Sequence, residues 1–159
     1  MSEEFSQTMA DSFGYLFILS RRFEYITDKI LRRDGLTTKQ LLVLMAIGHG
    51  FTSPPSVSEV AELLSTSHQN VKAIANNLEK RGFVKMIRDE KDKRRWLLIL
   101  TPRNQEYWDS RFPEHSAAMF SLFKSLSPSE IQQLHGLVVK LIEGTEEVYE
   151  QAREKISLE

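Results

Sequence analysis

With 159 residues, 41% of them hydrophobic, the chain is long enough to bury one core, whereas two independent domains would each be only marginally stable. The absence of Cys excludes disulfides, thiolate metal sites and peroxide sensing by a cysteine. The formal net charge of −1 excludes a uniformly basic or acidic surface. A single domain over residues 1–159 is therefore expected.

The charge is unevenly distributed along the chain. Residues 65–101 carry nine Lys or Arg and four Asp or Glu, a net charge of +5, so the remaining residues carry −6. A polyanion would be attracted to this segment and repelled by the rest, which would orient it on the protein. From charge alone, a chance scatter of surface charges is an equal alternative.

No targeting or membrane segment is expected. Residues 1–11 contain Glu3 and Glu4 where a signal peptide has a basic region, and no apolar run approaches the roughly 18 residues of a membrane span. We expect a cytoplasmic protein without a membrane partner.

The first predicted helix begins at about residue 5 or 10 and ends at residue 33. Gly35 then provides a left-handed exit from the helix. Thr37 and Gln40 match a capping box for a second helix, which runs through Ile47 and stops in the following Gly-His-Gly. The apolar residues of the first helix keep a three-and-four spacing, which indicates one buried side: Phe13, Leu16, Phe17, Phe23, Ile26 and Ile30.

A pair of capped helices comes next. Two prolines prevent a helix over residues 51–55, where a loop or a very short strand is expected. A capping box from Ser56 to Glu59 opens a helix that ends near Leu64, and the next helix covers Ser67 to Arg81 before a terminating glycine. Six residues suit the contacts of a tight pair: Val60, Ala61, Leu64, Val71, Ile74 and Leu78.

Two strands are predicted after this pair. Residues 83–88 and 95–100 are rich in aromatic and branched residues. The continuous apolar run from Trp96 to Leu100 indicates a strand covered on both sides. The six residues between the strands, 89–94, are all charged and must project into water or toward a ligand.

The C-terminal part of the chain is predicted to form long helices. Thr101 suits an N-cap with Pro102 at the first helical position, and Pro113 should kink or interrupt the helix that follows. A capping box from Ser127 to Glu130 opens the last helix. This helix carries an apolar stripe of Ile131, Leu134, Val138, Leu141, Ile142, Val148 and Tyr149.

The helix from Ser67 to Arg81 presents hydrogen-bonding side chains on the side opposite its packing residues. Gln and Asn can pair bidentately with adenine, and Lys can donate to guanine, in the DNA major groove. An ordinary solvated face is the alternative. Because the helix follows a capped partner and precedes a charged hairpin, which is the layout of a winged helix-turn-helix, we favour DNA contact.

The charged hairpin tip has a corresponding interpretation as a wing. Arg94, with Lys91, Lys93 and Arg95, could enter a minor groove, while Asp92 could hold Arg94 in an extended pose. A solvated turn is the alternative. After the helix pair, the groove interpretation is favoured.

Three segments together form a specific pattern. They are Leu36 to Gln40, the run from Val71 to Val84 that contains LEKRGFV, and Asp92-Lys93-Arg94 with Leu100-Thr101 beyond it. This pattern resembles the MarR family, the multiple antibiotic resistance regulators. The resemblance covers about residues 36–101, and the flanking helices fit it in order and length.

The resemblance implies a mainly α fold with a small β-hairpin wing, in which a winged helix-turn-helix at residues 36–101 is flanked by dimerisation helices at residues 5–33 and 102–159. It implies a homodimer that binds double-stranded DNA at a pseudo-palindromic operator, and a repressor released by a small lipophilic or phenolic effector. A dimer has a second reason, because one module buries too little surface for tight specific binding and a twofold pair reads half-sites roughly 34 Å apart.

The resemblance also implies which residues contact DNA and which form the dimer. In the recognition helix, the predicted DNA-binding residues are Ser67, His68, Gln69, Asn70, Lys72, Ala73 and Asn76. In the wing they are Lys91, Asp92, Lys93, Arg94 and Arg95. The predicted dimerisation residues are Phe5, Met9, Phe13, Leu134, Val138, Leu141 and Val148. Met86, Ala73 and Asn77 stand where many family members have basic residues, which affects the operator sequence and binding strength.

Other kinds of site have little support. Six residues could line an effector pocket, but residues of this kind at helical spacing are more often core, so none is assigned: Phe17, Tyr25, Met45, Phe51, Trp108 and Phe112. The four His are widely separated and no nucleophile, metal or phosphate-loop motif occurs, so we expect no enzyme, metal or cofactor. The rival to DNA binding is a winged-helix adaptor or antirepressor that binds protein, although the outward helix face offers no apolar anchors for one.

Overall fold

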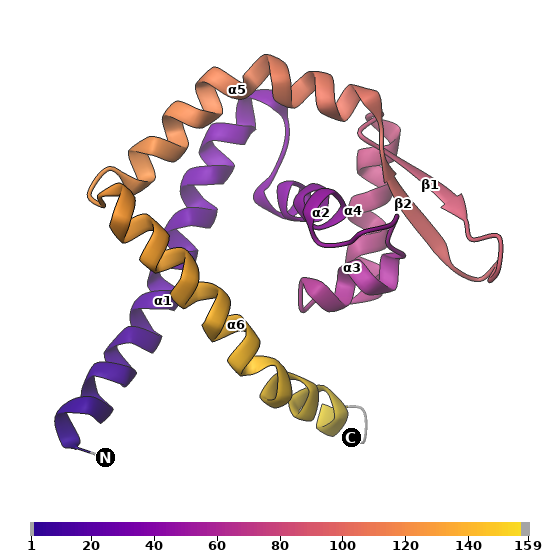
Figure 1. The fold of residues 1–159 in the computed structure, drawn as a ribbon. Helices are drawn as coiled ribbons and strands as arrows, with labels where there is room; N and C mark the ends of the chain where they lie inside the picture. The colour runs from indigo at the N-terminus through magenta and orange to yellow at the C-terminus, as the bar shows by residue number, and fades with distance from the viewer. Residues whose placement is uncertain (1, 157–159) are drawn as a thin grey trace. The chain divides into compact units, whose positions relative to one another are not determined.

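The computed structural model describes residues 2–156 (Figure 1). The chain divides into two compact units, with the boundary between Trp108 and Asp109 inside one helix. The single domain expected from the sequence stays a prediction. The elements in order are α1 (Glu3–Leu31), a 3-10 turn η1 (Arg32–Asp34), α2 (Thr38–His49), α3 (Val57–Leu63), α4 (His68–Lys80), β1 (Val84–Arg88), β2 (Trp96–Leu100), α5 (Pro102–Phe123) and α6 (Pro128–Ile156).

The helix starts follow from local hydrogen bonds. Thr37 and Ser56 form complete capping boxes with Gln40 and Glu59, as predicted. Before α6, the Ser127 hydroxyl accepts from the backbone N–H of Glu130 at 3.3 Å, and the Glu130 carboxylate accepts from the N–H of Ser127 at 2.7 Å. Such caps satisfy N–H groups that have no partner inside the helix.

Two glycines end helical segments as expected. Gly35 has φ 65° after η1 and Gly82 has φ 78° after α4, both in the left-handed region that glycine adopts without steric cost. The left-handed exit predicted at Gly35 is therefore confirmed. Each glycine redirects the chain into the next element of the first unit.

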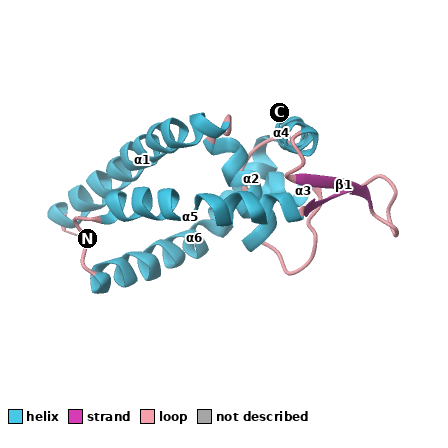
Figure 2. Cartoon of the chain, turned by 90° about the horizontal axis from the view of Figure 1, so that it is seen from above, coloured by secondary structure: helices cyan, strands magenta, loops and turns pink. Residues whose placement is uncertain are grey.

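The sheet is a two-stranded antiparallel hairpin that projects beyond α2, α3 and α4 (Figures 1 and 2). Its register runs from Val84 opposite Leu100 to Arg88 opposite Trp96. Residues 51–55 form a loop, and a single bridge at Ser56 attaches the end of this loop to β2. The choice between loop and very short strand is thus resolved as a loop with one bridge.

The core of the first unit lies among α2, α3, α4 and the hairpin. Leu78 and Leu98 are completely buried, and α1 contributes Leu31. Of the contacts predicted for the helix pair, four residues are buried and two are half-buried, so that side of α4 is confirmed as the packing side. The buried hydrophobic residues are Leu31, Leu36, Val43, Leu44, Ala46, Ile47, Val57, Val60, Ala61, Val71, Ala75, Leu78, Phe83, Val84 and Leu98.

Three details differ from the sequence predictions. Pro113 lies inside α5, so of the kink or interruption predicted there the interruption does not occur, and a kink stays a prediction. A proline removes one N–H donor and crowds the carbonyl four residues before it, but the residues on either side of Pro113 remain helical. The strand expected to be covered on both sides is fully buried only at Leu98, because a two-stranded sheet leaves its neighbours partly open. The first helix begins at Glu3 and ends at Leu31, and η1 covers the remaining residues to Asp34.

The second unit contains the later part of α5 and all of α6. Its large hydrophobic side chains include Phe112, Phe120 and Leu137, which are all well exposed. Among the described residues, none of the helices combines the length and apolar character needed to cross a membrane.

Candidate nucleic-acid interface

A short turn sets the angle between α3 and α4. Ser65 has φ 49°, which makes it the one non-glycine residue in the left-handed region among residues 2–156. The N–H of Thr66 donates to the carbonyl of Ala61 at 2.9 Å, which satisfies the end of α3. The hydroxyl of Ser67 then accepts from the N–H of Asn70 at 3.1 Å and caps α4. The turn is bonded on both sides and fixes the direction in which α4 leaves it.

The predicted DNA-binding residues of α4 share its solvent side. Val71, Ala75 and Leu78 are fully buried on the opposite side of this helix. A helix repeats every 3.6 residues, so residues three and four apart lie along one surface. All seven predicted residues are exposed, namely Ser67, His68, Gln69, Asn70, Lys72, Ala73 and Asn76.

These exposed residues differ in whether the protein already uses them. Ser67 caps the helix, and the Asn70 amide donates to the Thr66 hydroxyl at 2.9 Å, so both serve the turn. The side chains of Gln69, Lys72 and Asn76 make no hydrogen bond or ion pair to any residue that the structure describes, and the same holds for His68. Donors and acceptors are therefore available along one side of α4.

Two contacts that the sequence did not indicate attach α4 to other parts of the first unit. The amide of Gln40 donates to the amide oxygen of Asn77 at 2.7 Å, and joins α2 to α4. The guanidinium of Arg81 donates to the carbonyls of Asp34 and Gly35, each at 2.6 Å. The sequence placed Arg81 only at the end of the helix, because no local pattern marks partners 46 and 47 residues away.

The wing is attached to the helix pair by hydrogen bonds from the main chain of both strands. The N–H of Leu98 donates to the carbonyl of Pro55 at 2.8 Å, which connects β2 to the segment before α3. The carboxylate of Glu79 accepts from the N–H of Met86 at 2.7 Å, so α4 also holds β1. The hairpin is thus fixed to both helices of the helix-turn-helix.

All five predicted wing residues are exposed, and Asp92 contacts Arg94. Its carboxylate accepts from the backbone N–H of Arg94 at 2.9 Å. The sequence interpretation had Asp92 hold Arg94 in an extended pose, without naming the atom that it contacts. A short Asp side chain reaches the N–H two residues ahead, which is the geometry of an Asx turn. Asp92 therefore shapes the turn. The side chains of Lys91, Lys93 and Arg94 extend from it and form no hydrogen bond or ion pair in the described part of the chain.

Arg95 binds back to the protein. Its guanidinium lies 2.9 Å from the carboxylate of Glu59, in an ion pair of two half-exposed side chains. The same carboxylate accepts from the N–H of Ser56 at 2.7 Å in the capping box of α3. These bonds lower the pKa of Glu59, that from the Ser56 backbone most and those from Arg95 least. Glu59 joins the start of α3 to the end of the wing tip.

Polar bonds also connect α1 and α5 to the module. The carboxylate of Asp28 accepts from the N–H of Thr38 at 2.6 Å and from its hydroxyl at 2.7 Å. The bond from the backbone of Thr38 is the main cause of a lowered pKa at Asp28. The hydroxyl of Tyr107 donates to Asp34 at 3.0 Å. Across residues 2–153, no group of three or more His, Asp or Glu side chains is arranged to hold a metal ion.

The predicted dimerisation residues lie on open surfaces of their own units. In α1, Phe5, Met9 and Phe13 are more than half exposed, at 56%, 54% and 64%. In α6, Val138, Leu141 and Val148 are exposed, and Leu134 is half-buried. An exposed patch of apolar side chains on a helix commonly marks an interaction site.

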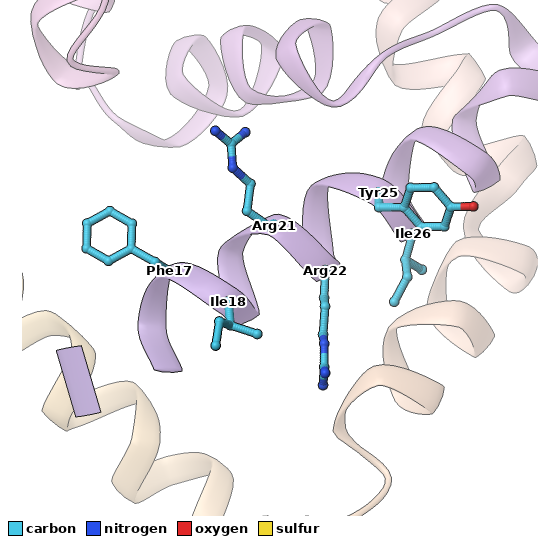
Figure 3. Close-up of a pocket in the computed structure, with 6 residues that line it drawn as sticks. All are labelled: Phe17, Ile18, Arg21, Arg22, Tyr25 and Ile26. Carbon is cyan, nitrogen blue, oxygen red and sulfur yellow. The ribbon is translucent and has the colours of Figure 1, made fainter. Parts of the chain in front are cut away.

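A hollow of about 510 Å³ opens along α1 (Figure 3). In Figure 3, Phe17 and Arg21 leave the helix on the side opposite Ile18 and Arg22. The hollow is lined by Phe17, Ile18, Arg21, Arg22, Tyr25 and Ile26. Of the six residues considered for a pocket, two therefore share this hollow. Phe51 lines a separate hollow of about 300 Å³ beside β2, and Trp108 packs against the core.

Comparisons with known proteins agree with this architecture. The sequence profile described as "MarR family" matches residues 34–95. The chain is 28% identical over 127 residues to "Uncharacterized HTH-type transcriptional regulator YkoM" of Bacillus subtilis, across 77% of this chain and 80% of that protein. It is 27% identical over 115 residues to "Transcriptional repressor MprA" of Escherichia coli, across 72% of this chain and 65% of that protein.

Among solved structures, the chain is similar to that in "Crystal structure of S. aureus MepR-DNA complex". The TM-score is 0.67 at 20% identity, over 83% of this chain and 97% of that chain. At this identity the similarity shows the fold alone. The predicted winged helix-turn-helix fold with additional helices is confirmed.

Proposed function

The chain belongs to the MarR family of transcriptional regulators, and we propose that it binds double-stranded DNA as a homodimer at a pseudo-palindromic operator. In this proposal α4 contacts base edges in the major groove and the wing enters the adjacent minor groove. Proteins of this kind are regulators and not enzymes, in agreement with the expectation from the sequence.

The exposed polar side of α4 is the observation that carries the proposal. Gln69, Lys72 and Asn76 are separated by three and four residues, and none of them is engaged by the described protein. An amide can pair with adenine and a Lys with guanine, each good contact contributing about 1–3 kcal/mol of discrimination. We assign base recognition to these three residues, and to His68 and Ala73 beside them. Ser67 and Asn70, whose side chains serve the turn, would contact the DNA backbone.

The wing supplies the sequence-independent part of the affinity. Lys91, Lys93 and Arg94 place three cations at the tip, and Asp92 keeps the turn in shape. Contacts between such cations and phosphates release counterions, so the affinity must fall steeply with salt. Arg95 contributes a further positive charge while it remains paired with Glu59.

A homodimer gives the exposed apolar residues of α1 and α6 a partner. The predicted dimerisation residues on these helices are largely open to water in one chain. A twofold arrangement would also present two copies of α4 to half-sites about 34 Å apart. This spacing is one turn of the DNA helix, so both copies would read the same side of the duplex.

We further propose that the protein is a repressor released by a small lipophilic or phenolic effector, and that it acts in the cytoplasm where its operator lies. A relative named as a transcriptional repressor supports the direction of regulation. The hollow on α1 supports an effector, since aromatic and aliphatic side chains lie there beside Arg21 and Arg22. Such a lining suits an apolar ring that carries an acidic group.

A genomic selection tests the proposal. Bound fragments are recovered from DNA of the host, and the Kd for one recovered site is measured from low to high salt beside a scrambled duplex. We expect a preference for the recovered site, and a logarithmic salt slope of about −0.9 for each phosphate contact. If the protein binds no duplex even at low salt, DNA binding is refuted and the protein-binding adaptor becomes the better description. A reporter gene under the recovered site then separates repression from activation.

A further inference from the structure

Arg88 joins the two ends of the wing tip. It is the last residue of β1 and pairs with Trp96, the first residue of β2. Its guanidinium carbon lies 3.9 Å from the centre of the Trp96 ring, which is the geometry of a stacked cation–π pair. The same guanidinium donates to the carbonyl of Lys93 at 2.7 Å and, less closely, to that of Arg94 at 3.4 Å. One side chain therefore connects the last pair of the strands to the main chain of the tip.

The rest of the tip is also internally bonded. The N–H of Lys91 donates to the carboxylate of Asp89 at 2.8 Å, and this bond is the main cause of a lowered pKa there. The N–H of Asp89 donates to the carbonyl of Arg95 at 3.1 Å, and the N–H of Arg95 to the carbonyl of Asp92 at 2.9 Å. Together with Arg88, these bonds give the charged tip one defined conformation.

The cations at and next to the wing tip fall into two groups. Arg88 and Arg95 bind inward, to the tip main chain and to Glu59. Lys91, Lys93 and Arg94 are exposed, and their side chains make no hydrogen bond or ion pair with the described protein. The first group is therefore suited to hold the tip, and the second to meet DNA.

We propose that Arg88 is a positioning residue of the wing, which stacks on Trp96 and fixes the main chain of residues 93 and 94 so that Arg94 projects toward DNA. The inference rests on the proposed function. Arg suits this task because the face of a planar guanidinium can stack on a ring while its edge donates hydrogen bonds. A tip ordered before binding loses less conformational freedom when it enters a groove.

Direct contact between Arg88 and a phosphate is the competing role, and salt dependence distinguishes the two. Removal of a phosphate contact lowers the logarithmic salt slope by about 0.9 for each protomer bound. Loss of a positioning residue weakens binding at every salt concentration and leaves the slope nearly unchanged. Trp96→Leu makes the distinction sharp, because it removes the stack without changing any charge.

The experiment measures Kd for a recovered operator fragment at several salt concentrations, using the full chain. The variants are Arg88→Gln, Trp96→Leu and Arg94→Gln, with Lys85→Gln as the matched control, since Lys85 is an exposed cation of the same strand. We expect Arg88→Gln and Trp96→Leu to weaken binding about fivefold, which corresponds to about 1 kcal/mol, with an unchanged slope. Arg94→Gln should lower the slope, and Lys85→Gln should change the affinity less than twofold.

Hydrogen exchange of the free protein provides a readout that needs no DNA. The backbone N–H groups of Arg94 and Arg95 should exchange faster in Arg88→Gln and in Trp96→Leu than in Lys85→Gln. Trp96 also packs against the core, so Arg88→Gln carries the test if the Trp96 variant does not fold.

Two results would overturn the positioning role. One is unchanged exchange at the tip of Arg88→Gln, and the other is a salt slope reduced as much as by Arg94→Gln. By contrast, wild-type protein that binds no duplex refutes the proposed function itself, while the exchange data still report on the tip.

Discussion

Replacing Arg94 with Ala should weaken operator binding while leaving the fold intact. The guanidinium of Arg94 makes no hydrogen bond or ion pair with the described protein, and the backbone N–H of this residue can still donate to Asp92 after the substitution. An exposed side chain of this kind changes the free energy of unfolding by less than about 0.5 kcal/mol. A change in DNA affinity can therefore be separated from a change in stability.

The expected magnitude follows from the two DNA interactions that the substitution removes. A homodimer carries two copies of Arg94, and a hydrogen bond that involves a charged group contributes about 1.5–3 kcal/mol. At the lower value the two copies together contribute about 3 kcal/mol, which corresponds to about a 150-fold increase in Kd. If each Arg94 neutralises one phosphate, the salt slope should fall by about 1.8.

Fluorescence anisotropy with a labelled operator measures both quantities, and thermal unfolding checks the fold. Lys124→Ala is the matched control, because it removes an exposed positive charge from the turn between α5 and α6. It should leave the affinity within about twofold, since long-range charge effects are screened at physiological salt. Equal affinities of Arg94→Ala and the control would refute the wing contact.

Three further substitutions test other parts of the reasoning. Leu141→Asp, on the exposed stripe of α6, should convert the dimer to a monomer in light scattering and abolish operator binding. Gln132→Asp, which lies on the other side of the helix by spacing, should do neither. A monomer that binds as tightly as wild type would disprove the dependence of DNA binding on dimerisation. Ser65→Val should lower the free energy of unfolding by about 1–3 kcal/mol in urea titrations, because φ 49° is strained for a β-branched residue. Equal urea midpoints for Ser65→Val and Ser65→Gly would contradict the strain at this position. Hydrogen bonds lower the pKa of Glu59 in the folded state, so the stability that this carboxylate contributes is complete above the ordinary pKa of 4.5 and is lost as the pH falls through the lower folded pKa. Glu59→Gln should reduce this loss of stability in urea titrations below pH 4.5. An unaltered pH dependence would exclude Glu59 as the source of the loss.

The order of elements could be predicted because its causes are local. A capping box such as that of Ser56 and Glu59 forms between residues three positions apart, and Gly82 ends α4 through its own backbone freedom. The solvent side of α4 was also predictable from the period of the helix, which separates Val71 and Leu78 from Lys72 and Asn76. These features need no information about distant parts of the chain.

Local reasoning left two details open. A kink or an interruption was expected at Pro113, but the helix continues through this residue, so only the kink stays a prediction. Asp92 was expected to hold Arg94 in an extended pose, and its short side chain reaches the backbone N–H of that residue. In both positions the sequence singled out the residue, and the folded chain was needed for the geometry.

The sequence by itself determined which residues cap helices, which face of α4 is polar and where the charged tip lies, because these properties depend on neighbours within one or two turns. Only the tertiary structure decided that Arg81 binds the carbonyls of Asp34 and Gly35, and that Arg88 and Arg95 bind inward while Arg94 does not. A guanidinium has several donors and a long flexible side chain, so its partner depends on which carbonyl, carboxylate or ring the folded chain brings within reach. No spacing along the sequence carries that information.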